Sequence, residues 1–500
     1  MCELRLSIPL SEYIEALSNN VLNVYNNNST NSIQVVDVSN DSRKVSTGFL
    51  FVAINGEYSD GHKYIKSALD RGASALIVEN YSDELRQLEI PVIHVVNSYY
   101  AYASISELRF SYPSKDLKLI GVTGTNGKTS SAYLIRHILK NLGKNVGLIS
   151  TVNYSYGDVD VPADRTTPMP YELQKMFYEM VEAGCEYVVM EASSHALHQN
   201  RFGGAQFDAA LFTNISGDHL DYHKTMENYY AAKKLLFKEK LKSNGFAVIN
   251  VDDYYGNKLY NEIFILKYTY GLGNTDYKPL FPNANSSELV ALMFDSKKFP
   301  FTTNLTGIYN CMNVLGAIAI AHGLGFDLSE ILSSFDKPVF IPGRLERVHS
   351  SDGVEYYVDY AHSDDALKRV LEALRAKNPK KLVVVFGCGG DRDKTKRARM
   401  GKVASQLADK IYITSDNPRT EKPDAILDDI EKGIEKKVDY QKEKDRKIAI
   451  KMAVILTEPG SIVLVAGKGH EQYQEINGVK YHFDDRELLR EFISQKENRI

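Results

Sequence analysis

The chain of 500 residues, 43% of them hydrophobic, is long enough for about three domains with buried cores. Its 60 basic and 64 acidic side chains leave a formal charge of -4 and are scattered, which argues against a nucleic-acid-binding protein. The cysteines form no C-x-x-C pair and no run of about 18 apolar residues occurs, so we expect a cytoplasmic protein without a disulfide framework, a zinc knuckle or a membrane-spanning segment.

Residues 1–115 have the pattern of a small α/β unit. Strand-like apolar runs at 49–54 and 74–79 flank a helical segment at 61–72. We therefore expect a separate N-terminal domain.

The stretch LIGVTGTNGKTSSAYLIRHIL, residues 119–139, predicts a phosphate-binding loop. An apolar strand leads into a glycine-rich turn, and Lys128 and Thr129 then open a helix. Backbone N–H groups, the helix N-terminus and the lysine charge hold phosphate, and the threonine hydroxyl can reach a magnesium ion. The usual spacing has glycine at 122, where this chain has Val122, so the loop is a variant; a glycine-rich turn with an exposed lysine is the alternative.

Residues 116–343 alternate apolar runs with helical stretches, and residues 344–500 do so again after IPGRLERV (341–348), which resembles a hinge. This alternation is typical of largely parallel sheets with helices on both faces. Ligand sites in such sheets lie at the carboxyl ends of the strands, so the polar residues there are the candidates.

Two polar clusters follow strands of the central block. Glu191 ends an apolar run and can hold a magnesium ion beside Thr129, or it is solvated or caps a helix. His219 and His223 lie four residues apart, as in a zinc pair on a helix, but no third ligand with suitable spacing follows. A polar helix start capped by Asp218 is the alternative for that segment.

Two arginines follow strands of the C-terminal block. VFGCGGDRD places Arg392, and SDNPR places Arg419, where each can bind phosphate or carboxylate. Individually these are ordinary loops.

Together and in this order, the motifs resemble the Mur ligases, ATP-dependent amide-forming enzymes of peptidoglycan precursor synthesis. The resemblance covers nearly the whole chain and rests on GTNGKTS, RTTP, EASSHAL, DHLDYH, AAK, IPGR, VDYAH, FGCGGDRD, DNPR and GKGHE. It implies three α/β domains: a uridine-nucleotide domain at 1–115, a P-loop ATPase domain with a mostly parallel sheet at 116–343, and a Rossmann-like domain for the incoming amino acid at 344–500.

The resemblance is to those family members that add meso-2,6-diaminopimelate to UDP-N-acetylmuramoyl-L-alanyl-D-glutamate through an acyl phosphate, releasing ADP and phosphate. It implies three cofactors: ATP, Mg²⁺ and CO₂, which carbamylates a lysine. It also implies that the protein is a monomer in the bacterial cytoplasm and that its partners are small molecules rather than nucleic acid. The rival hypotheses are the same ligase using L-lysine, an amide ligase similar to folylpolyglutamate synthetase and, in a different class, a nucleotide-gated binding or regulatory protein.

Roles carried over by position cover four groups of residues. The implied ATP-binding residues are Gly124, Thr125, Asn126, Gly127, Lys128, Thr129, Asn313, Arg344 and Asp359. The implied catalytic residues are Lys128, Lys233 and His219, and the implied metal-binding residues are Thr129, Glu191, His219 and Lys233, with Lys233 carbamylated to N6-carboxylysine. The residues implied to bind the UDP-muramoyl dipeptide are Ser42, Glu57, Tyr58, Ser59, Thr166, Thr167, Ser193, Gln199 and Arg201. The residues implied to bind diaminopimelate are Arg392, Asp416, Asn417, Pro418, Arg419, Gly467 and Glu471. His362 is expected near the phosphates.

Overall fold

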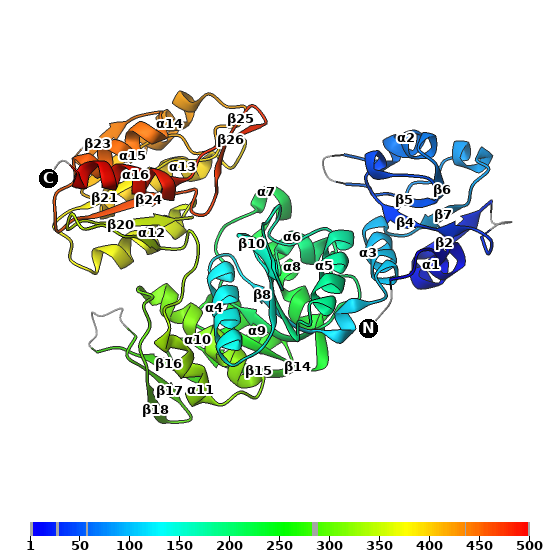
Figure 1. Ribbon diagram of the computed structural model, residues 1–500, viewed down its shortest axis with the longest axis horizontal. Coiled ribbons are helices and arrows are strands. Elements are labelled where there is room, and N and C mark those ends of the chain that lie inside the picture. The colour runs from blue at the N-terminus through cyan, green and yellow to red at the C-terminus, as the bar shows by residue number, and fades with distance from the viewer. Residues whose placement is uncertain (1–3, 27–29, 57–58, 283–288, 436, 499–500) are drawn as a thin grey trace.

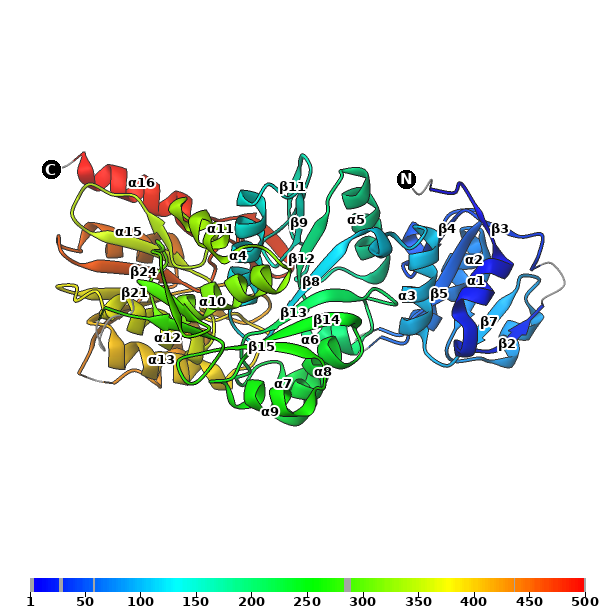
Figure 2. The ribbon, with the colours of Figure 1, turned by 90° about the horizontal axis from the view of Figure 1, so that it is seen from below.

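The computed structural model describes residues 4–26, 30–56, 59–282, 289–435 and 437–498. Figure 1 shows three α/β bodies, and Figure 2 shows them in a row, with the N-terminal body (blue) at one end and the C-terminal body at the other. The expected fold class, three α/β domains with mostly parallel sheets, is confirmed. None of the described helices is long and apolar enough to cross a membrane.

The N-terminal body is built on a five-stranded sheet in the order β2-β7-β6-β5-β4, in which only β2 is antiparallel. Both predicted strands form, as β5 (Phe49–Ala53) and β6 (Ala73–Val78). The predicted helix begins as a 3-10 turn because the Asp60 side chain accepts the His62 N–H, and it continues as α2 (Ile65–Asp70). The remaining elements are α1 (Leu10–Leu17), β2 (Val21–Tyr25), β4 (Asp37–Ser39), β7 (Val92–Val95) and α3 (Ser98–Arg109).

The central body has an 11-stranded sheet whose middle strands, in the order β9-β12-β8-β13-β14-β15, are parallel. Alternate residues of β8 enter different apolar cores: Ile120 packs on the side of α4 and α10, and Leu119 on the side of α5 and α8. The strands are β8 (Lys118–Thr123), β9 (Val146–Ile149), β12 (Tyr187–Glu191), β13 (Phe207–Phe212), β14 (Leu241–Asn250) and β15 (Leu266–Tyr270). The helices that matter for the site are α4 (Lys128–Asn141), α5 (Pro170–Glu182), α6 (Ser194–His198), α7 (Leu220–His223), α8 (Met226–Lys238) and α10 (Ile308–Gly323).

The C-terminal body has a six-stranded sheet in the order β19-β20-β24-β21-β22-β23, parallel except for β19. Helices cover both of its faces, and a hairpin of β25 and β26 extends from it (Figure 1). The strands are β19 (Glu346–Val348), β20 (Glu355–Asp359), β21 (Leu382–Phe386), β22 (Lys410–Ile413), β23 (Asp439–Lys442), β24 (Ile462–Ala466), β25 (Tyr473–Ile476) and β26 (Val479–His482). The helices are α12 (Asp364–Arg375), α13 (Thr395–Leu407), α14 (Pro423–Glu431), α15 (Arg446–Ile455) and α16 (Asp485–Glu497).

The segment between the central and C-terminal bodies contains Gly343, which adopts a left-handed φ of +64°. A Cβ at this position would collide with the backbone of Gly469 and His470, in the loop that follows β24. Glycine is therefore required both by the backbone conformation and by the close approach of the two chain segments.

Two hydrogen bonds, one of them to a buried carboxylate, connect the N-terminal body to the central body. Glu107 of α3 accepts the Gly204 N–H at 2.7 Å, and Tyr171 of α5 donates to Asp37 at 2.8 Å. Burial raises the pKa of Glu107 to about 7, although the backbone N–H of Gly204 and the positive charge of Lys240 oppose this shift. The interface thus holds a carboxyl group that titrates near neutral pH.

This carboxyl should make stability depend on pH. The raised pKa means that the folded protein binds the proton more tightly than the unfolded chain, so the contribution of Glu107 is complete below pH 4.5 and is lost as the pH rises to about 7. We expect the free energy of unfolding, relative to Glu107→Gln, to fall by up to about 3 kcal/mol across this window. Lys240 and Lys115 are the cations that face the carboxylate.

Thermal unfolding of both proteins from pH 4.5 to 8 measures the difference, and Glu84→Gln, at an exposed position of the same body, is the matched control. Parallel pH profiles for the unmodified protein and Glu107→Gln would contradict the assignment.

Candidate active site

The loop between β8 and α4 has the geometry of a phosphate-binding loop. Gly127 caps α4 with φ +87°, and Lys128 is the first residue of the helix. The Lys128 ammonium group donates to the carbonyl oxygens of Gly124 and Thr125 at 3.0 and 2.7 Å, so it curls over its own loop. Val122, which departs from the usual spacing, is a buried residue of β8 and lies outside the turn.

Thr129 and Glu191 meet beside this loop, as expected for two residues around one magnesium ion. The threonine hydroxyl donates to Glu191 at 2.8 Å, and the same carboxylate accepts the backbone N–H of Thr151 at 2.7 Å. Arg344, from the C-terminal side of the hinge, donates to the Thr129 oxygen at 3.2 Å. A hydroxyl and a carboxylate at hydrogen-bond distance are oxygen donors of the kind that Mg²⁺ prefers, so this pair fits the ion.

Lys233 lies on the buried face of α8 and points at the same loop. Its side chain is 1% exposed, and its amine donates to the Gly124 carbonyl at 2.6 Å. Burial, followed by the positive charge of Lys128, lowers the pKa of Lys233 well below its usual range. A neutral lysine amine is the form that reacts with CO₂, so the position fits a carbamate, whereas the neighbouring Lys234 pairs with Glu262 at 3.0 Å.

His219 stands at the start of α7 in a left-handed conformation with φ +53°. Asp218 accepts the His219 N–H at 2.9 Å, but the residue that caps α7 is His219 itself, so the predicted Asp218 cap is wrong. The zinc-pair alternative is not supported either, because the His223 ring turns inward to the Ser194 hydroxyl at 3.0 Å. The described residues contain no cluster of three or more His, Cys, Asp or Glu side chains that could hold a metal ion.

Asn313 and Asp359 differ in how they meet the loop. Asn313 of α10 lies against Gly127, where a Cβ on the glycine would strike the amide oxygen. Asp359, at the end of β20, is buried and accepts the N–H groups of Leu345 and Ala361 at 2.6 and 2.8 Å. The Asp359 carboxylate, which the family resemblance assigns to the nucleotide, therefore also stabilises the conformation of the hinge.

The residues assigned to the muramoyl dipeptide form one hydrogen-bonded group. Thr167 donates to Ser193 at 3.1 Å, and Arg201 is clamped by Gln199 at 2.7 Å and by the Thr167 carbonyl at 2.8 Å. Thr166 accepts from Thr151 at 3.1 Å, which links this group to Glu191.

The first-domain residues assigned to the same substrate lie apart from this group. Ser42 is buried in a 3-10 turn, and Ser59 contacts Tyr64 at 3.3 Å. Glu57 and Tyr58 lie outside the described residues. A second cavity of about 620 Å³ between the N-terminal and central bodies is lined by Asn97, Tyr99 and Gln199, but not by either serine.

The residues assigned to diaminopimelate converge at the carboxyl ends of β21, β22 and β24. Asn417 donates to Glu471 at 2.9 Å, and the Asp416 carboxylate accepts the Asn417 N–H at 2.7 Å. Lys468 is fully buried and donates to both Asn417 and Glu471, at 3.1 and 3.0 Å. Pro418 is buried, and the Gly390 N–H donates to the Asn417 carbonyl at 2.9 Å, which fixes the turn.

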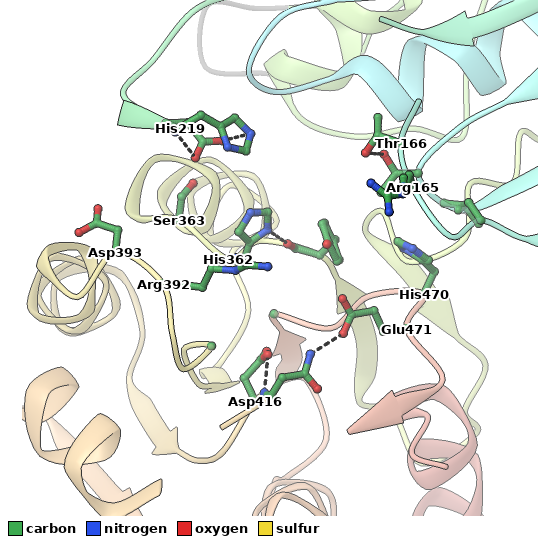
Figure 3. A pocket seen from close by; sticks show the side chains of 18 of the residues that line it. Arg165, Thr166, His219, His362, Ser363, Arg392, Asp393, Asp416, His470 and Glu471 are labelled. Atoms are coloured by element: carbon green, nitrogen blue, oxygen red, sulfur yellow. Dashed lines mark hydrogen bonds and ion pairs between the residues drawn. The ribbon is translucent and has the colours of Figure 1, made fainter. Parts of the chain in front are cut away.

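One cleft of about 1350 Å³ is lined by Thr166 of the dipeptide group and by most of the residues assigned to diaminopimelate. Figure 3 shows His219, Thr166 and Arg165 on the central side, facing His362, Arg392, Asp416 and Glu471 on the C-terminal side. Gly467 and Arg419 also line it. Desolvation within the cleft and then the positive charge of Lys396 lower the pKa of His362.

Two residues that contact the candidate site, Lys468 and Asp365, were not predicted from the sequence. Lys468 sits between two glycines in GKGHE, where an exposed loop lysine is the default interpretation. Asp365 of α12 accepts from Asn126 of the phosphate loop at 3.0 Å, and no local pattern reveals such a contact between distant segments.

Comparison with known proteins places the chain. Residues 122–321 match the Mur ligase middle domain, residues 343–469 the Mur ligase glutamate ligase domain, and residues 34–108 the Mur ligase family catalytic domain. A UDP-N-acetylmuramoyl-L-alanyl-D-glutamate--2,6-diaminopimelate ligase of Chlorobaculum tepidum is 44% identical over 478 residues, covering 92% of this chain and 93% of the relative. The chain belongs to the Mur ligase family. Another Mur ligase of the same name, from Clostridium tetani, is 40% identical over 97% of this chain and 99% of its own length.

Solved structures agree with this membership. A structure of a UDP-N-acetylmuramoyl-L-alanyl-D-glutamate--2,6-diaminopimelate ligase has a TM-score of 0.68 at 31% identity, covering 98% of this chain and 99% of that one. The MurF ligase of Thermotoga maritima in complex with ADP shares the fold at 21% identity, with a TM-score of 0.61 and coverage of 93% and 98%. As in other Mur ligases, ATP drives the formation of an amide bond.

Proposed function

We propose that this Mur ligase joins meso-2,6-diaminopimelate to UDP-N-acetylmuramoyl-L-alanyl-D-glutamate with hydrolysis of ATP to ADP and phosphate, in the synthesis of peptidoglycan precursors. The observation that carries the proposal is the cleft of about 1350 Å³, which has Thr166, a candidate for the dipeptide, on its central side and the candidates for the amino acid on its C-terminal side. The names of the relatives described above support the choice of substrates.

The first step moves the γ-phosphoryl group of ATP to the terminal carboxylate of the dipeptide, giving an acyl phosphate and ADP. Lys128 and the backbone of residues 124–129 would bind the phosphates, a role that consists of positioning and charge neutralisation. Thr129, Glu191, His219 and carbamylated Lys233 would hold Mg²⁺, which when bound neutralises the repulsion between phosphate and carboxylate.

The second step forms the amide. The amine of the acceptor amino acid attacks the acyl carbon, phosphate leaves, and the nitrogen releases its proton. Asp416, Asn417, Arg419 and Glu471 would hold the acceptor across the cleft. Closure of the cleft around both substrates would protect the acyl phosphate from water.

The rival hypotheses fit less well. A folylpolyglutamate synthase of Mycobacterium tuberculosis aligns with only 74% of this chain, at 16% identity, and so shares the fold alone. A regulatory nucleotide-binding protein has no need for Lys233 buried against the phosphate loop. L-lysine lacks the second carboxylate that Arg419 is proposed to bind.

Release of ADP tests the proposal. We expect rapid release only when the UDP-muramoyl dipeptide, ATP and meso-diaminopimelate are all present, with much slower release when L-lysine replaces diaminopimelate. Equal release without any amino acid would favour a nucleotide hydrolase, and release with glutamate and a folate would favour the folylpolyglutamate alternative.

A further inference from the structure

The hairpin of β25 and β26 grips Arg419 through the backbone. The Arg419 N–H donates to the Glu475 carbonyl at 3.1 Å, and the Asn477 N–H donates to the Arg419 carbonyl at 2.9 Å. Arg419 also forms an isolated bridge with Ile476 and holds a left-handed φ of +49°. The backbone of Arg419 is therefore held against the hairpin rather than free in a loop.

The Arg419 side chain is held by one residue of the same hairpin and by one residue outside it. The Glu475 carboxylate accepts from Arg419 Nε at 3.0 Å, and the Gly390 carbonyl accepts from Nη1 at 2.8 Å. Within the described residues, no hydrogen bond is assigned to Nη2. A guanidinium group has a planar fork, so fixing Nε and one Nη1 hydrogen fixes the direction in which the remaining N–H groups point.

Arg419 lines the cleft, whereas Glu475 does not. The two side chains are 20% and 24% exposed, so the ion pair is partly shielded from water. An arginine free to rotate would lose side-chain entropy each time it bound a carboxylate, and Glu475 removes that loss by ordering the fork in advance.

We infer that Glu475 is a positioning residue for the acceptor amino acid: it sets the Arg419 fork so that its free Nη edge meets the far carboxylate of the acceptor. This inference rests on the proposed function. It implies that discrimination between diaminopimelate and L-lysine depends on a residue that touches neither substrate.

A double-mutant cycle tests it, using steady-state kinetics of ADP release by the full-length protein. Glu475→Ala should raise the KM for meso-diaminopimelate at least about tenfold, since it removes a hydrogen bond between charged groups, while kcat and the KM for ATP stay nearly unchanged. Glu475→Gln keeps an acceptor for Nε and should fall between the unmodified enzyme and the alanine variant. In an Arg419→Ala background, Glu475→Ala should have no further effect on the KM for diaminopimelate.

Glu458→Ala, which removes an exposed carboxylate paired with Lys380, is the matched control. The inference is overturned if Glu475→Ala leaves the KM for diaminopimelate unchanged, or if it raises that KM equally with and without Arg419. If Glu475→Ala does not fold, Glu475→Gln decides by the same cycle. Absence of diaminopimelate-dependent ADP release by the unmodified enzyme would instead refute the proposed function.

Discussion

Lys233→Ala should reduce turnover by at least about 10²-fold, because it removes the proposed carbamate from the magnesium site. Lys233 is the buried lysine whose amine contacts the Gly124 carbonyl of the phosphate loop, and its lowered pKa favours the neutral amine that can react with CO₂. Formate or acetate should restore part of the activity of the alanine variant, since a free carboxylate can occupy the space that the side chain leaves. The measurement is the rate of ADP release with and without the added acid.

Lys234→Ala is the matched control, because Lys234 is the next residue of α8 and pairs with Glu262 away from the loop. It should retain nearly full activity. Full activity of Lys233→Ala would remove Lys233 from the site, and activity lost without any rescue would leave a role in packing as the explanation.

Arg419→Ala should sharply raise the KM for meso-diaminopimelate and narrow the gap between this substrate and L-lysine. A site built around a hydrogen-bonding group can reject an analogue that lacks the partner by roughly 10⁴-fold, and the second carboxylate is what separates the two amino acids. Arginine supplies a planar fork that lysine or a neutral side chain cannot copy. The ratio of kcat/KM for the two amino acids, before and after the change, measures the contribution.

Arg490→Ala, on the exposed side of α16, controls for the loss of a positive charge. If the unmodified enzyme used L-lysine as efficiently as diaminopimelate, the specificity argument would fail although membership of the Mur ligase family would stand.

The sequence predicted the elements that depend on local patterns. β5 and β6 follow from apolar periodicity, and the turn between β8 and α4 follows from its glycines; the structure confirms the two strands and the strand–turn–helix form of the loop. Resemblance to the family supplied the roles of residues such as Lys233, whose position on a helix alone does not distinguish it from Lys234.

Contacts between distant segments could not be predicted in this way. Glu107 lies in a helix where a carboxylate is ordinarily solvated, and only the approach of Gly204 buries it. Lys468 and Glu475 act on partners 51 and 56 residues away in the chain, so no spacing rule connects them. The role of Asp359 in binding the nucleotide stays a prediction, but the two hydrogen bonds that it accepts from backbone N–H groups around the hinge could not be predicted from the sequence.

The close contact between Gly343 and Gly469 connects the hinge segment, residues 341–348, to the loop that follows β24. No side chain separates the two backbones, so a displacement of Gly343 would press directly on Gly469 and His470. A rotation of the C-terminal body about the torsions that precede Gly343 would carry Glu471 with it. Such a rotation would change the distance between the amino acid that Glu471 is proposed to hold and the acyl carbon.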